Sequence, residues 1–131
     1  MRRSIVAAAA MLIVAALAPA GVLAHHSFAA EYDSKAPITV SGIVTKIEWT
    51  NPHAYVYLDV KDDEGKMANW AFEGYPPNTL KRTGFTRDLI KPGDAITITG
   101  WRAFDNSIRA AGREITLTDG RKVLLGPQAA Q

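Results

Sequence analysis

From residue 38 onward the sequence consists of short runs rich in Val, Ile, Thr, Tyr and Trp, separated by clusters of Gly, Pro, Asn and Asp. The run 53–60 alternates most regularly, because its even-numbered residues are all apolar and its odd-numbered residues are His, Tyr, Tyr and Asp. A two-residue period places successive side chains on opposite faces of a strand. No segment after residue 30 keeps the period of an amphipathic helix. The pattern therefore predicts an all-β domain.

Five main strands are predicted from these runs. They span residues 38–49, 53–60, 67–73, 95–102 and 108–117, and residues 123–125 add a short edge strand. Residues 79–82 predict a short helix or pair of turns between the third and fourth strands. In the first strand the apolar residues change phase beside Gly42, which indicates a bulge or a sharp bend. These features are typical of a five-stranded Greek-key barrel of the OB type, and an up-and-down meander is the alternative.

The start of the chain carries the pattern of an export signal. Arg2 and Arg3 precede thirteen uncharged residues, 5–17, and small residues stand at positions 22 and 24. Thirteen residues fall short of the ~20 that a helix needs to cross a bilayer, so a cleaved signal peptide is predicted rather than an anchor. Cleavage is expected after Ala24, and a cut after Ala20 is the alternative. We therefore expect a periplasmic or secreted bacterial protein.

The predicted division is a signal peptide over 1–24, an N-terminal segment over 25–36 and an OB-like barrel domain over 37–126. The chain has 15 Lys and Arg against 13 Asp and Glu, which gives a formal charge of +2. Removal of Arg2 and Arg3 leaves 13 residues of each sign. A neutral domain lacks the basic surface that nucleic acid or an anionic membrane requires, so we expect neither as a partner. A domain of this size can bury a core alone, which is consistent with a monomer.

The histidines are the residues best suited to chemistry. The chain has no cysteine and three histidines, so any metal ion would be held by nitrogen and oxygen. Cleavage after Ala24 would give His25 a free α-amine, which can chelate an ion together with an imidazole, and His26 and His53 can supply further nitrogens. Such ligands favour Cu(II), followed by zinc or nickel. The sequence therefore predicts a copper-type site at these three histidines, with binding rather than catalysis as its role.

Neighbouring residues extend this hypothesis. Tyr55 and Tyr57 share a strand face with His53 and are expected to line the site. Glu31 and Asp33 are candidate hydrogen-bond acceptors for the histidines. In the plain alternative, the two histidines at the new N-terminus form only a polar tail and His53 caps a turn.

A second class of function rests on the aromatic residues. OB-type barrels bind ligands on the face of strands two and three, where Tyr55 and Tyr57 lie opposite an apolar face. These tyrosines can hold a peptide, a glycan or a partner protein without metal, whereas Trp70, Phe72 and Trp101 are expected in the core. A copper-dependent oxidoreductase built on the same histidines is a third hypothesis, and no catalytic residue is predicted for it.

Two motifs resemble those of a known family. The stretches 25–33 (HHSFAAEYD) and 48–54 (EWTNPHA) are similar to motifs of small exported bacterial proteins grouped as domain-of-unknown-function family 6152. Residues 69–73, 91–94 and 119–121 also fit its pattern, so the resemblance covers essentially the whole chain after the signal. The loop 73–77 is the place where similar sequences vary. The resemblance implies export and a small β-domain, and it brings no established activity, cofactor or site residue.

Overall fold

A computed structural model describes residues 28–128 of the chain. The predicted signal peptide, His25 and His26 lie outside the described residues. The elements are β1 (Tyr32–Glu48), β2 (Tyr55–Lys61), β3 (Met67–Glu73), α3 (Pro77–Arg82), β4 (Ala95–Ala103), β5 (Arg109–Thr116) and β6 (Lys122–Leu124). A short helical turn over residues 28–31 precedes β1. Over the described range, no helix combines the length and the apolar character needed to cross a membrane.

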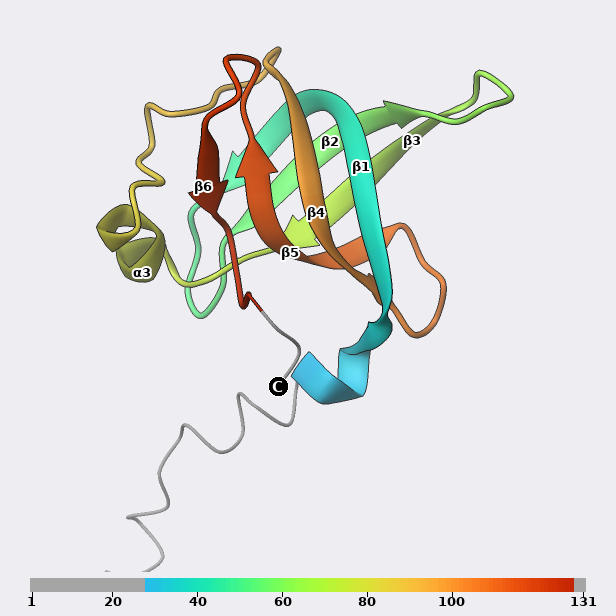
Figure 1. Cartoon of the computed structure of the whole chain (residues 1–131), viewed down its shortest axis with the longest axis horizontal. Coiled ribbons are helices and arrows are strands. Elements are labelled where there is room, and N and C mark those ends of the chain that lie inside the picture. The colour runs from blue at the N-terminus through green and yellow to red at the C-terminus, as the bar shows by residue number, and fades with distance from the viewer. Residues whose placement is uncertain (1–27, 129–131) are drawn as a thin grey trace, which may run out of the picture.

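The strands are joined in the order β3-β2-β1-β4-β5-β6, and a further pairing of β3 with β5 closes a ring of five strands (Figure 1). The closing pair is parallel, whereas every other pair is antiparallel. In a meander each strand would pair with the next one along the chain, whereas here β1 pairs with β4 and β3 pairs with β5, which is the Greek-key order of an OB-like barrel. The helix α3 connects β3 to β4, as the sequence predicts.

The first strand belongs to both halves of the barrel. Residues 37–43 of β1 pair with β4 and residues 43–48 pair with β2, so the strand bends where the two ladders meet. At that point a Cβ on Gly42 would lie 2.4 Å from the carbonyl oxygen of Asp59. The β1–β2 register also shifts between Val44 and Lys46. The phase change in the sequence is therefore confirmed as a bend with an adjacent irregularity, and β1 begins earlier than predicted, at Tyr32.

The main core fills the interior of this ring. The alternation predicted for β2 is confirmed, because Ala54, Val56 and Leu58 are at most 1% exposed. Phe72 from β3 and Leu80 from α3 complete the same cluster and are fully buried. Burying side chains of this size contributes ~1.5–3 kcal/mol each relative to exposure. The apolar face of β2 therefore fixes which of its side chains point outward.

A second, smaller cluster lies on the outer face of the sheet. It consists of Tyr32, Trp101, Ala103 and Ala111, with Phe28 packed against them. Trp101 is buried, as expected, but in this outer cluster, because it stands on β4 at a position that alternates with Ile96 and Ile98 of the main core. It is buried because the start of the described chain folds over it. The ring of Phe28 meets the ring of Trp101 edge-on at 6.0 Å between centroids.

Candidate functional site

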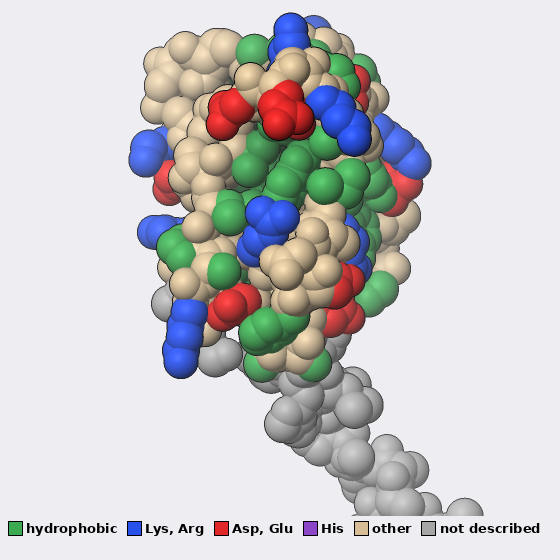
Figure 2. Space-filling model, turned by 90° about the vertical axis from the view of Figure 1, so that its right-hand side faces the viewer, with side chains coloured by type: hydrophobic (Ala, Val, Ile, Leu, Met, Phe, Trp, Pro, Cys, Tyr) green, Lys and Arg blue, Asp and Glu red, His purple; other side chains and the backbone are tan. Residues whose placement is uncertain are grey.

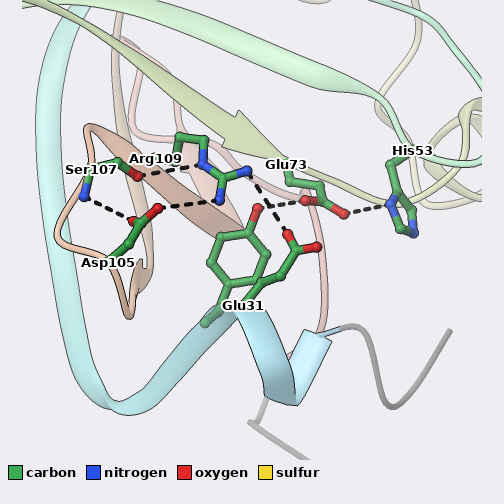
Figure 3. Close-up of polar contacts among 7 residues, drawn as sticks. Glu31, His53, Glu73, Asp105, Ser107 and Arg109 are labelled. Carbon is green, nitrogen blue, oxygen red and sulfur yellow. Dashed lines mark hydrogen bonds and ion pairs between the residues drawn. The ribbon is translucent and has the colours of Figure 1, made fainter.

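Glu73, the last residue of β3, joins three parts of the chain through its carboxylate (Figure 3). The hydroxyl of Tyr32 donates a hydrogen bond to Oε2 at 2.5 Å. The Nδ1 atom of His53 lies 2.5 Å from Oε1. Tyr32 is buried, and the side chain of Glu73 is only 16% exposed. The two oxygens of one largely buried carboxylate therefore hold a tyrosine on one side and a histidine on the other.

The hairpin of β2 and β3 places His53 beside Glu73. Tyr55 pairs directly with Glu73, and backbone bonds continue the ladder past the strand ends. The N–H of Gly74 donates to the carbonyl of Ala54 at 2.8 Å. Because residues two apart in an extended chain share a face, His53 lies on the same outer face as Tyr55 and next to Glu73. The register of the hairpin thus brings this histidine and this carboxylate together.

The contact with Glu73 decides which nitrogen of His53 is available. A neutral imidazole carries one N–H and one lone pair, and a carboxylate at Nδ1 holds the N–H there. The lone pair is then at Nε2, on the far side of the ring. A carboxylate in this position orients the ring. The His53 side chain is 33% exposed, so its ring is held by Glu73 and is still accessible from outside.

A small pocket of about 140 Å³ adjoins the pair. His53 and Glu73 form one part of its wall. Phe28 from the N-terminal turn forms another part, and Pro127 comes from the other end of the described chain. The remaining lining residues are Gly74, Tyr75 and Ala111. The pocket therefore brings the segment that directly follows His25 and His26 to the side of His53.

A second polar group is centred on Arg109, the first residue of β5 (Figure 3). Arg109 is 3.9 Å from a carboxylate oxygen of Glu31 and 3.9 Å from one of Asp105. Its Nε also donates to the hydroxyl of Ser107 at 3.4 Å. Half-exposed ion pairs of this kind contribute little to stability, about 0–1 kcal/mol. They connect the β4–β5 loop to the helical turn that precedes β1.

Tyr55 and Tyr57 lie on the outer face of β2, as predicted. Their ring centroids are 6.4 Å apart. The hydroxyl of Tyr57 donates to Glu48 at 3.1 Å, and the ammonium of Lys46 stands 5.3 Å from the centre of its ring. The bond from Lys46 and then the bond from Tyr57 lower the pKa of the Glu48 carboxyl. Tyr57 is thus already engaged by neighbours on β1, whereas Tyr55 is nearer to the Glu73 carboxylate.

Burial raises the pKa of three tyrosines above the ordinary value of 10.0. The hydrogen bond to Glu73 raises the pKa of Tyr32 further, and the nearby charge of Glu73 does the same for Tyr55. For Tyr57 the additional cause is its hydrogen bond to Glu48. A raised pKa means that the folded state keeps a proton that the unfolded state loses. The resulting stabilisation is present below pH 10 and is lost as the pH rises above it. Urea unfolding between about pH 9 and 11 should show this loss, and it should be smaller in Tyr32→Phe, from which the most strongly buried phenol is absent.

The predicted site residues are thus only partly brought together. His53 stands in the position described, whereas Glu31 pairs with Arg109, and Asp33 accepts the backbone N–H of Lys35 at 2.9 Å. The acceptor for His53 is Glu73, which was not predicted. The hairpin turn at 62–65 could have pointed to Glu73. Pairing the two strands on either side of that turn places Glu73 opposite Tyr55. Among residues 28–128, no three His, Asp or Glu side chains gather as a metal site.

The fold and the site define an OB-like β-barrel with a carboxylate-held histidine on its outer face. The chain belongs to the family of unknown function DUF6152, whose model matches residues 11–112. The matched range contains all three histidines and Glu73. Searches of the curated proteins and of the solved structures found no match.

Proposed function

We propose that this protein is exported and binds a Cu(II)-type metal ion through Nε2 of His53 together with the nitrogens of His25 and His26. The observation that carries the proposal is the contact between His53 Nδ1 and the carboxylate of Glu73. A histidine that ligates a metal commonly donates its other ring N–H to a carboxylate. Here the carboxylate is itself held by Tyr32, so the imidazole is oriented before any ion arrives.

Covalent geometry supports a contribution from the N-terminal histidines. Phe28 lines the same pocket as His53, and His26 is two residues before it in the chain. Consecutive Cα atoms are ~3.8 Å apart, so the Cα atom of His26 is at most about 7.6 Å from that of Phe28. Cleavage after Ala24 would add the α-amine of His25. Nitrogen ligands of this number and kind favour Cu(II) over zinc and nickel.

The role that follows is metal binding or carriage. The chain supplies an imidazole whose orientation is set, and near neutral pH a bound metal would displace the remaining protons of the terminal nitrogens into solvent. Nothing in this chemistry requires an organic substrate. A redox enzyme on the same ligands would in addition turn over an oxidant such as hydrogen peroxide, and an assay of the copper-loaded protein for peroxide consumption separates that alternative from a carrier.

Copper titration of the protein with a defined N-terminus tests the proposal. Mass spectrometry first establishes whether the exported chain begins at His25, and spin resonance then reports the nitrogen ligands of bound Cu(II). His53→Ala should weaken binding by roughly tenfold or more, in line with the loss of a positioned ligand. Tyr57→Phe, on the same strand face but bonded to Glu48, serves as the control and should bind as the wild type does. Copper binding that is unchanged in His53→Ala would reject the site.

A binding face without metal is the second candidate, and the outward pair of Tyr55 and Tyr57 favours it. Side-by-side phenol rings on an OB-type face can stack on a sugar. Titration with a trimer of β-linked N-acetylglucosamine in the presence of EDTA should then shift the ring resonances of both tyrosines. Tyr55→Ala should abolish the shift. The absence of any shift at millimolar sugar would remove this candidate.

A further inference from the structure

The barrel is open along one edge of β3. This strand pairs with β5 only through residues 71–73. Its first half, residues 67–70, has β2 on one side and, among the residues that the structure describes, no strand on the other. Figure 1 shows the β2–β3 hairpin extending beyond the rest of the ring. Interior side chains at this end are therefore not covered by a neighbouring strand.

Apolar side chains border this opening, which we call the open seam. It is bordered by Trp70 of β3, by Arg102 of β4, whose guanidinium lies over the Trp70 ring, and by Ile108, whose carbonyl accepts the backbone N–H of Ala71. Trp70 packs against the main core, whereas Ile108 is 46% exposed. The side of the molecule that carries the hairpin tip shows a hollowed apolar surface with a basic side chain within it and acidic and basic side chains around its rim (Figure 2). Contiguous exposed apolar surface of this kind marks binding sites more often than ordinary surface does.

The basic residue of the open seam is Arg102. Arg102 lies on β4, on the same inward face as Ile98. Its guanidinium is 5.4 Å from the centre of the Trp70 ring. Nη2 makes a long bond of 3.4 Å to the carbonyl of Asn106, and Nε is buried with no hydrogen-bond partner among the residues that the structure describes. Within residues 28–128, no carboxylate pairs with this guanidinium. An arginine N–H that is buried without an acceptor is costly, and a bound anion would supply the missing acceptor.

We propose that the open seam binds an amphiphilic carboxylate of the fatty-acid class. The guanidinium of Arg102 would receive the carboxylate, since its planar set of donors matches two carboxylate oxygens. The apolar chain would lie over Trp70 and Ile108, and this contact would remove apolar surface of both the ligand and the protein from water. The ligand needs both a carboxylate and an apolar chain, because the seam offers one cation beside apolar side chains. The seam is on the inner face of β3, opposite to Glu73, so this site and the proposed metal site are independent.

Decanoate below its micelle concentration is the probe, and the indole N–H resonance of Trp70, assigned through its absence in Trp70→Phe, is the readout. We expect decanoate to shift this resonance on saturation. Decanol, which has the same chain without the charge, should bind roughly tenfold or more weakly, because a charge-assisted hydrogen bond is lost. Shortening the chain to octanoate should weaken binding by about threefold to fourfold for each methylene that is buried.

Substitutions at two stacked arginines separate the proposal from general charge effects. Arg102→Gln should make decanoate and decanol bind alike, whereas Arg102→Lys should keep a preference for decanoate. Arg87→Gln is the matched control, because Arg87 also stacks on a tryptophan, 5.2 Å from the centre of the Trp49 ring, but away from the seam. If Arg102→Gln does not fold, comparing the binding of decanoate and decanol by the wild type and by Arg102→Lys still tests whether a cation at this position holds the carboxylate. Equal binding of acid and alcohol by the wild type, or no shift of Trp70, overturns the proposal.

Discussion

Replacing Glu73 by alanine is expected to lower the free energy of unfolding by about 2–3 kcal/mol and to weaken Cu(II) binding by roughly 10–100-fold. The first effect arises because the buried hydroxyl of Tyr32 loses its acceptor. The second arises because His53 loses the group that fixes its ring and its N–H position. Urea unfolding measures the first quantity in the absence of metal, and copper titration measures the second.

Glu73→Gln separates the two roles of this carboxylate. The amide oxygen can still accept from Tyr32, so most of the stability should be retained. The amide nitrogen is a donor and cannot accept the N–H of His53, so the loss in copper affinity should persist. Should Glu73→Ala bind copper as tightly as the wild type while losing stability, the carboxylate is structural only and does not position a ligand.

Gly42→Ala is expected to cost about 3 kcal/mol of folding stability or to prevent folding. The new methyl group would lie 2.4 Å from the carbonyl oxygen of Asp59 and 3.0 Å from a methyl group of Val60, and neither a backbone carbonyl nor a β-branched side chain yields easily. Added atoms in a packed site typically cost ~1–3 kcal/mol, and this contact is with backbone. Thermal unfolding and urea unfolding both report the change.

Ser41→Ala is the matched control for this prediction. Ser41 is the neighbouring residue on β1 and is exposed, and its hydroxyl shares a solvent-exposed hydrogen bond of 2.7 Å with the hydroxyl of Thr97. Its replacement should change stability by no more than about 0.5 kcal/mol. A cost for Gly42→Ala as small as that of Ser41→Ala would show that the bend of β1 tolerates a side chain.

The strands were predictable because their pattern depends on residues that are close together in the sequence. Alternation along β2 follows from the two faces of a strand, and the burial of Val56 and Leu58 bears it out. The bounds predicted for β3 are those observed, 67–73, since a turn on one side and Gly74 on the other limit it. The bend beside Gly42 was also visible, because an apolar phase change has no other simple cause in a strand.

The site was only half predictable. His53 was identified because an imidazole is a versatile ligand in any context. The register of the hairpin could have placed Glu73 opposite Tyr55, but nothing near Glu73 in the sequence showed that its carboxylate is largely buried and also meets Tyr32. Its partner Tyr32 is 41 positions away in the chain, and that contact exists only because β1 extends to Tyr32 and packs on the outer face of β4 and β5. The Glu73 carboxylate can position His53 only because Tyr32 and His53 lie beside it. Those contacts depend on how β1, β2 and β3 are arranged.

The sequence by itself determined the all-β class, the OB-like order of elements, the outward face of β2 and the residue types available for binding. Each of these depends on side-chain periodicity or on turn residues within a few positions of one another. The tertiary structure decided that Trp101 packs outside the barrel, that Glu73 holds both Tyr32 and His53, and that β3 leaves an open seam beside Arg102. These depend on which strands meet and over what length. Such contacts between distant parts of the chain are fixed by the closure of the whole barrel, and no local pattern records them.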